Sequence, residues 1–171
     1  MDSMLNNFYN NGFAVVNDPE IFTAFQDIDS WEWINKKHQS LQRIKPSSEI
    51  DYIMMITQNI IGEKYVKQFN NSYTLGDDLD LVNGMDAATL SWHNDNQEGY
   101  NLCALLYFDS VDEEIGGMTR FRDIKTKQIT GEFYPKKYDI SLMNHSIHFE
   151  HIVTPMILPL DRRVALFNFN I

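Results

Sequence analysis

Residues 87–107, ATLSWHNDNQEGYNLCALLYF, place a polar turn between two apolar runs whose residue types favour β-strands. His93 and Asp95 lie two residues apart at the start of this turn. On a strand such residues share one face and are separated by roughly 6–7 Å, whereas on a helix they point about 200° apart. Because residues 89–92 are strand-like and residues 94–99 are loop-like, the pair is expected where a strand ends, with both side chains able to reach one ion.

The same residues also fit a plain structural turn. Asn94, Asp95 and Asn96 are types that hydrogen-bond to their own backbone in turns, and His93 would then be a partly buried aromatic residue. The spacing alone does not choose between the ligand pair and the turn.

The pattern on either side of this stretch indicates a mostly β fold with helices at the N-terminus. From Tyr73 onward, short runs rich in β-branched and aromatic residues alternate with turn clusters, which predicts six to eight strands in a sandwich or barrel, that is, an antiparallel double-stranded roll and not a parallel sheet. Before it, residues 13–18 predict a strand, and residues 19–41 and 47–69 predict two helices that pack on the roll. We expect a single domain over 1–171, with the supporting strand and helices in 1–72 and the strand-rich core in 73–171.

Composition limits the function classes. The chain has 171 residues, 43% of them hydrophobic, which suits one globular domain. Its formal net charge of −10 argues against nucleic-acid binding, and no apolar run is long enough to cross a membrane. A single cysteine, Cys103, excludes a disulfide framework, and residues 1–13 do not have the pattern of a signal peptide, so a cytoplasmic location is expected. The oligomeric state stays open.

A third ligand is available near the other end of the chain. Residues 145–155, HSIHFEHIVTP, contain three histidines, and on a strand Phe149, His151 and Val153 share one face. His151 is therefore our choice, because His145 and His148 fall nearer the irregular start of this strand. Two histidines and one carboxylate form the facial triad of non-haem Fe(II) oxygenases, which leaves open positions on the metal. A closed structural zinc site would usually need thiolates, and the chain has one cysteine.

These residues carry a family resemblance. The ordered set resembles the 2-oxoglutarate- and Fe(II)-dependent dioxygenases, and is most similar to their prolyl 4-hydroxylase-type branch. It consists of His93-x-Asp95, Gly116-Gly117 before a strand, His151-x-Val153-x-Pro155, and Arg163 at the start of the last strand, RVALFNF. The resemblance covers about residues 73–171.

The resemblance implies that residues 73–171 form a catalytic core with a double-stranded β-helix, a cupin-like jelly roll, with Fe(II) held by His93, Asp95 and His151 and with 2-oxoglutarate lying inside. Arg163 matches the arginine that grips the distal carboxylate of the cosubstrate, and a planar guanidinium suits that role because it makes two charge-assisted bonds. Strand alternation allows only one of Arg162 and Arg163 to point inward. Tyr107 matches a tyrosine whose hydroxyl contacts the same carboxylate. The family often has serine or threonine two residues after the arginine, where this chain has Ala165.

The activity implied by the resemblance is hydroxylation of an aliphatic C–H bond in a small molecule or a peptidyl residue, with O2 consumed and succinate and CO2 released. Related halogenases lack the carboxylate ligand, so Asp95 favours hydroxylation. Two alternatives stay open: a non-catalytic metal-binding jelly roll, and a cupin-type oxygenase that does not use 2-oxoglutarate. Substrate choice would depend on the rim, where Trp92, Arg120 and Arg122 are expected near the mouth; the two arginines would either receive an anionic substrate or pair with neighbouring acids.

Overall fold

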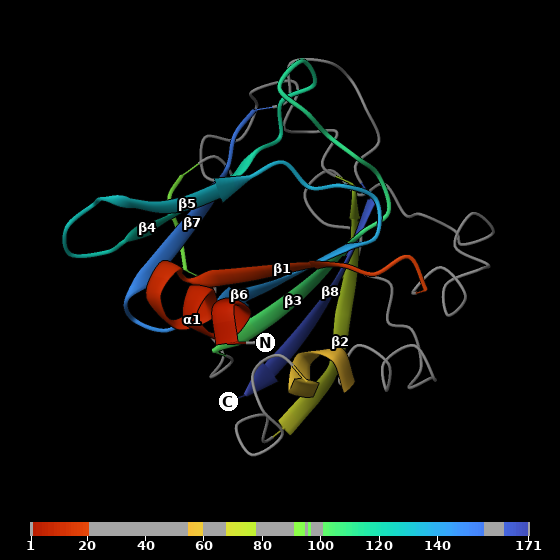
Figure 1. Ribbon diagram of the computed structural model, residues 1–171, viewed down its shortest axis with the longest axis horizontal. Helices are drawn as coiled ribbons and strands as arrows, with labels where there is room; N and C mark the ends of the chain where they lie inside the picture. Colours follow the sequence, from red (N-terminus) through yellow and green to blue (C-terminus); the bar gives the residue numbers. More distant parts are fainter. Residues whose placement is uncertain are drawn as a thin grey trace.

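The chain forms two antiparallel β-sheets in a computed structural model (Figure 1). The structure describes residues 2–20, 55–59, 68–77, 91–94, 96, 101–155 and 163–170, with 68–77 and 163–170 described as backbone only. In chain order the elements are α1 Asp2–Asn11, β1 Phe13–Asn17, β2 Gln68–Asp77, β3 Leu102–Tyr107, β4 Thr119–Asp123, β5 Ile129–Phe133, β6 Asp139–Asn144, β7 Phe149–Val153 and β8 Arg163–Asn170. Residues 55–59 are also helical.

The larger sheet has the strand order β1-β6-β3-β8-β2, and the smaller has the order β5-β4-β7. Among the described strands, all neighbouring pairs are antiparallel, although most neighbours are far apart in the sequence. The mostly β, two-sheet architecture expected from the sequence is therefore confirmed, and it is consistent with a jelly roll.

The core lies between the two sheets and shows which face of each sheet is interior. Cys103 of β3 and Met143 of β6 pack against Phe121 of β4, and each is about 1% exposed. Phe13 of β1 stacks on Phe121, with ring centroids 4.6 Å apart, and also on Phe133 of β5 at 5.4 Å. Burying aromatic rings from both sheets against one another stabilises the packing of the two sheets.

The N-terminal segment closes one side of this core (Figure 1). The side chain of Phe8 in α1 is fully buried. The backbone carbonyl of Phe8 accepts a hydrogen bond from Nδ2 of Asn144 at the end of β6. Gly12 follows the helix with a φ of 89°, a left-handed conformation that glycine adopts without strain. A Cβ at Gly12 would lie 2.7 Å from Cγ of Phe149, so close packing also requires glycine there.

Some expectations change and others fall outside the described residues. The strand at 13–18 is observed as β1, whereas α1 was not expected. β2 starts at Gln68, so residues 68 and 69 are strand rather than the end of a helix, and the expected boundary at 72/73 falls inside β2. The reason is pairing with β8, which begins at Gln68↔Asn170 and overrides the local helical spacing. The expected helix at 19–41 and most of that at 47–69 lie outside the described residues.

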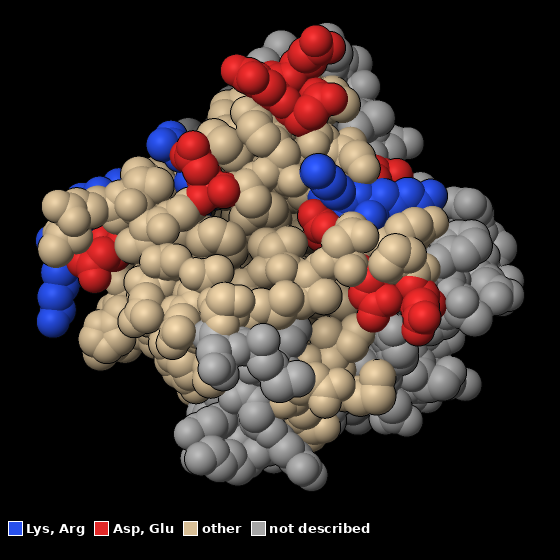
Figure 2. All heavy atoms as spheres, in the orientation of Figure 1, with Lys and Arg blue, Asp and Glu red and all other residues tan. Residues whose placement is uncertain are grey.

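Charge is distributed in patches of both signs. Figure 2 shows separate groups of acidic side chains on this face, with basic side chains between them. No helix in the described part of the chain is long and apolar enough to cross a bilayer.

Candidate metal centre

His93 and His151 are brought together by a backbone pairing. The amide of His93 donates to the carbonyl of His151 at 3.0 Å, and the amide of His151 donates back at 2.8 Å. Residues that exchange both hydrogen bonds in an antiparallel pair project their side chains from the same face. The two rings accordingly lie with centroids 4.3 Å apart and planes tilted by 53°.

The face that carries these two rings is the interior one. His151 sits in the middle of β7, and its register partner on β4 is Phe121, a residue of the core. The two rings have centroids 5.9 Å apart. The imidazole pair therefore lies inside the two-sheet fold and is continuous with the aromatic core.

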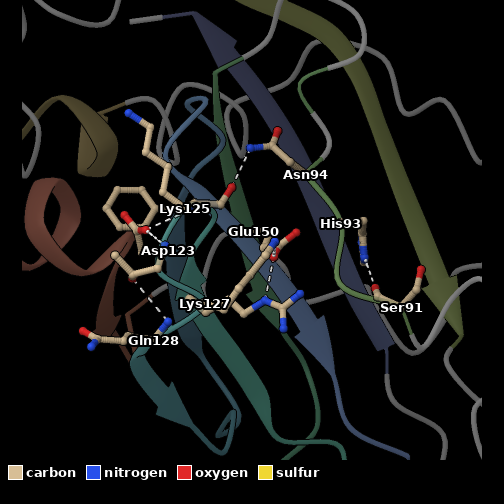
Figure 3. A network of polar contacts seen from close by, with 11 residues as sticks. Ser91, His93, Asn94, Asp123, Lys125, Lys127, Gln128 and Glu150 are labelled. Carbon is tan, nitrogen blue, oxygen red and sulfur yellow. Dashed lines mark hydrogen bonds and ion pairs between the residues drawn. The ribbon is translucent and has the colours of Figure 1, made fainter.

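The hydrogen bonding of His93 and the burial of His151 both suit metal binding. Nδ1 of His93 lies 2.7 Å from the carbonyl oxygen of Ser91, so Nδ1–H donates to that oxygen and Nε2 is the nitrogen that could ligate a metal (Figure 3). Burial of His151, with a further contribution from the nearby His93, lowers the pKa of His151 to about 3. At neutral pH the His151 ring is uncharged, which is the form that ligates a metal.

His145 also belongs to this cluster, and sequence reasoning did not select it. Its ring is 2% exposed and stacks on His151, with centroids 5.3 Å apart and planes 5° from parallel. The residue directly follows β6, and its amide donates to the carbonyl of Asn101. Its position depends on the end of β6 meeting the start of β3, which no local sequence pattern indicates. His148, in contrast, is exposed.

The third expected ligand, Asp95, lies outside the described residues, as does His38. Within the described part of the chain, no group of three or more His, Cys, Asp and Glu side chains is arranged to hold a metal ion. The donor chemistry of the two imidazoles fits a first-row transition metal. The assignment of His93, Asp95 and His151 as ligands remains a prediction.

The register of β8 bears on the expected cosubstrate residues. Tyr107 is fully buried, its hydroxyl lies 3.3 Å from Oγ of Ser141, and its ring contacts Phe133 of the opposite sheet. Tyr107 is therefore on the interior face. Its register partner on β8 is Val164, whereas Arg163 is paired with Asp77 of β2. Since paired residues share a face and neighbours along a strand alternate, Arg163 has the opposite parity to Tyr107.

The two arginines expected at the mouth are paired with acids. Nε of Arg120 lies 3.0 Å from Glu132, and Nε of Arg122 lies 2.6 Å from Glu150. Arg122 and Glu150 flank Phe121 and His151 along their strands, so they belong to the outer face of the smaller sheet. The Arg122 guanidinium also lies over the Trp92 ring at 4.1 Å, which is a cation–π contact. Of the two possibilities for these arginines, the structure favours pairing with acids.

Comparison with solved structures supports the fold. A prolyl hydroxylase from Trichoplax adhaerens, solved with a peptide fragment of the hypoxia inducible factor oxygen degradation domain, has a TM-score of 0.67 at 12% identity, covering 99% of this chain and 88% of that one. A prolyl-4-hydroxylase from Pseudomonas putida has a TM-score of 0.66 at 12% identity, with 99% and 97% covered.

HygX from Streptomyces hygroscopicus, solved with nickel and 2-oxoglutarate bound, has a TM-score of 0.61 at 12% identity, with 99% and 86% covered. No family profile and no curated protein sequence matches the chain. The chain therefore has the fold of the prolyl hydroxylases and related 2-oxoglutarate-dependent oxygenases.

Proposed function

We propose that this protein is an Fe(II)- and 2-oxoglutarate-dependent oxygenase. The observation that carries the proposal is the pair of adjacent imidazoles of His93 and His151 inside a fold shared with such oxygenases. Asp95, two residues after His93, would complete a facial triad. Two imidazoles and one carboxylate leave positions on the metal for a chelating cosubstrate and dioxygen, which a closed structural site does not provide.

The residues of the chain would bind and orient the reactants. His93, Asp95 and His151 would hold the metal, and the Nδ1 hydrogen bond from His93 to Ser91 would fix the orientation of the first imidazole. The aromatic core next to His151 would exclude water from that side of the site. When bound, iron and 2-oxoglutarate supply the oxidising power that inserts oxygen into a C–H bond, with succinate and CO2 as coproducts.

The distal carboxylate of the cosubstrate is proposed to bind the basic pair at 162–163 together with the Tyr107 hydroxyl. Tyr107 supports this because its ring is buried on the interior face. The register of β8 supports Arg162 over Arg163, since Val164 pairs with Tyr107 and Arg162 has the parity of Val164. Arg162 itself lies outside the described residues, so the variants Arg162→Ala and Arg163→Ala form a matched pair that decides between them. Replacing the arginine that binds the distal carboxylate should weaken 2-oxoglutarate binding, and replacing the other arginine should leave it unchanged.

The substrate is proposed to be a small molecule or a peptidyl residue, and hydroxylation is proposed over halogenation because Asp95 would occupy the position that a halide ligand requires. Anaerobic addition of Fe(II) and 2-oxoglutarate tests the site directly, since a metal-to-cosubstrate charge-transfer band in the visible is expected. The band should be lost in His151→Ala and Asp95→Ala. A screen for succinate release over peptides and small acids would then identify the substrate class.

The outcomes separate the alternatives. A folded protein that binds Fe(II) but gives no band with 2-oxoglutarate would overturn the proposal and favour a metal-binding module. Oxygen consumption without succinate would instead point to a cupin-type oxygenase.

A further inference from the structure

Asn94, the residue between the two expected ligands, makes an unusual set of contacts across the fold. Its Nδ2 donates to the carbonyl oxygens of Ser146 and Phe149, both at 2.6 Å. Figure 3 shows the Asn94 side chain and one of these bonds. Its Oδ1 accepts the backbone amide of Asn96 at 2.8 Å. Both ends of this carboxamide are therefore engaged: the donor end on the segment that leads into β7, and the acceptor end on the residue just beyond Asp95.

The chemistry of these contacts requires asparagine. A carboxamide offers two N–H donors and an acceptor on one short side chain, whereas aspartate offers no donor and serine offers one. The two carbonyls belong to residues 146 and 149, which lie five and two residues before His151. Losing the donors would remove one hydrogen bond from each of these partly buried carbonyls, and the Ser146 carbonyl would keep only the amide of Phe149 at 3.4 Å among the bonds described.

The backbone alone holds this segment weakly. Among the described residues, the pairing of 91–94 with β7 consists of the single pair His93↔His151. On a strand, Asn94 alternates with His93, so its side chain leaves from the face opposite the imidazole. Trp92, on the same side as Asn94, is covered by Arg122, which Glu150 of β7 holds. The residues on both sides of His93, Trp92 and Asn94, are therefore bound to the smaller sheet through side chains on its outer face.

We propose that Asn94 is a positioning residue for the metal site, which clamps the His93-x-Asp95 segment to the strand that carries His151. This inference rests on the proposed function in that it takes those residues as the ligands. The clamp sets the relative position of ligands that come from two distant parts of the chain. Residues that orient metal ligands without touching the metal commonly change metal affinity by about 10–100-fold when they are replaced.

The test is a Co(II) titration of metal-free protein under anaerobic conditions, followed by visible absorption. Asn94→Ala and Asn94→Asp are expected to raise the Kd for Co(II) by about 10–100-fold. Asn94→Ser keeps one donor and should lie between these variants and wild type.

The matched control is Asn17→Ala. Asn17 also donates two hydrogen bonds through Nδ2, to the Lys137 carbonyl at 3.2 Å and to Oδ1 of Asp139 at 2.8 Å, but it lies on β1 away from the histidines. Its replacement should lower the free energy of unfolding and leave the Kd for Co(II) unchanged. Urea unfolding of the metal-free variants gives the stability of each for comparison.

Each result has one interpretation. If Asn94→Ala folds, loses stability to the same extent as Asn17→Ala and binds Co(II) like wild type, Asn94 is only structural and the inference is overturned. If Asn94→Ala does not fold, wild-type affinity in folded Asn94→Ser overturns it equally. Wild-type protein that binds no Co(II) would instead overturn the proposed function, and this inference with it.

Discussion

Acid should destabilise the metal-free protein through His151 in particular. Burial and the neighbouring His93 lower the pKa of His151 to about 3, whereas a histidine in the unfolded chain has a pKa of about 6.5. Between these values the unfolded state binds a proton that the folded state excludes. The free energy of unfolding therefore falls as the pH decreases from about 6.5 toward about 3, and it is unaffected by this group above that window.

The size of the effect follows from the two pKa values. Below about pH 6.5, one such group lowers the free energy of unfolding by at most about 1.4 kcal/mol per pH unit. Acidification from about pH 7.5 to about pH 4.5 crosses about two of these units, so it should remove about 2.5 kcal/mol. The measurement is urea unfolding at both pH values in the presence of a chelator, for wild type and His151→Gln. The variant should be less stable at neutral pH and should lose about 2.5 kcal/mol less on acidification.

The control is His148→Gln, which replaces an exposed histidine three residues away. It should behave like wild type at both pH values. Equal losses for wild type and His151→Gln would refute the reasoning, because the His151 ring would then accept its proton without unfolding.

Four substitutions test the packing and charge of the smaller sheet. Phe121→Ala should lower the free energy of urea unfolding by about 3–5 kcal/mol, because removing a ring that is 1% exposed leaves a cavity beside His151. A loss below about 1 kcal/mol would mean that neighbouring side chains move to fill the cavity. Glu150→Gln should lower the free energy of unfolding by about 1–3 kcal/mol, mainly because the ion pair with Arg122 is lost. Lys127→Gln should lower it by less than about 1 kcal/mol because the Lys127 side chain is 54% exposed. A larger loss for Lys127→Gln than for Glu150→Gln would show that Arg122 is not the main partner of Glu150. Gly131→Ala should cost about 1–3 kcal/mol because a Cβ there would overlap the Phe13 ring, and an unchanged melting temperature would show that this ring can move aside.

Local patterns in the sequence predicted most of the strands and the local setting of two histidines. Alternation along 149–153 placed His151 on the face shared with Phe149, and both residues are buried. The change from strand-like to turn-like residues around His93 likewise indicated a strand end. These features depend on neighbours along the chain, so periodicity is sufficient to find them.

Features that depend on pairing between distant strands were not predictable in this way. Alternation along 162–169 divides these residues between the two faces of a strand, but it does not say which face is interior. The interior face is identified only by the register of β8 with β3, in which Val164 pairs with Tyr107. His145 joins the histidine cluster because β6 ends beside the start of β3. The β2 start at Gln68 similarly reflects its partner strand rather than its own sequence.

The pairing of β1 with β6 has a consequence for biosynthesis. Among the described strands, β1 at 13–17 comes before all the others in the sequence, yet its hydrogen-bonding partner is the strand at 139–144. The Phe13 ring therefore cannot take its place in the core until residues 139–144 have also left the ribosome. Such non-local contacts slow folding, and a nascent chain with an unpaired apolar strand is prone to aggregate. We expect yields of soluble protein to respond to chaperone supply and growth temperature more than the modest length of the chain would suggest.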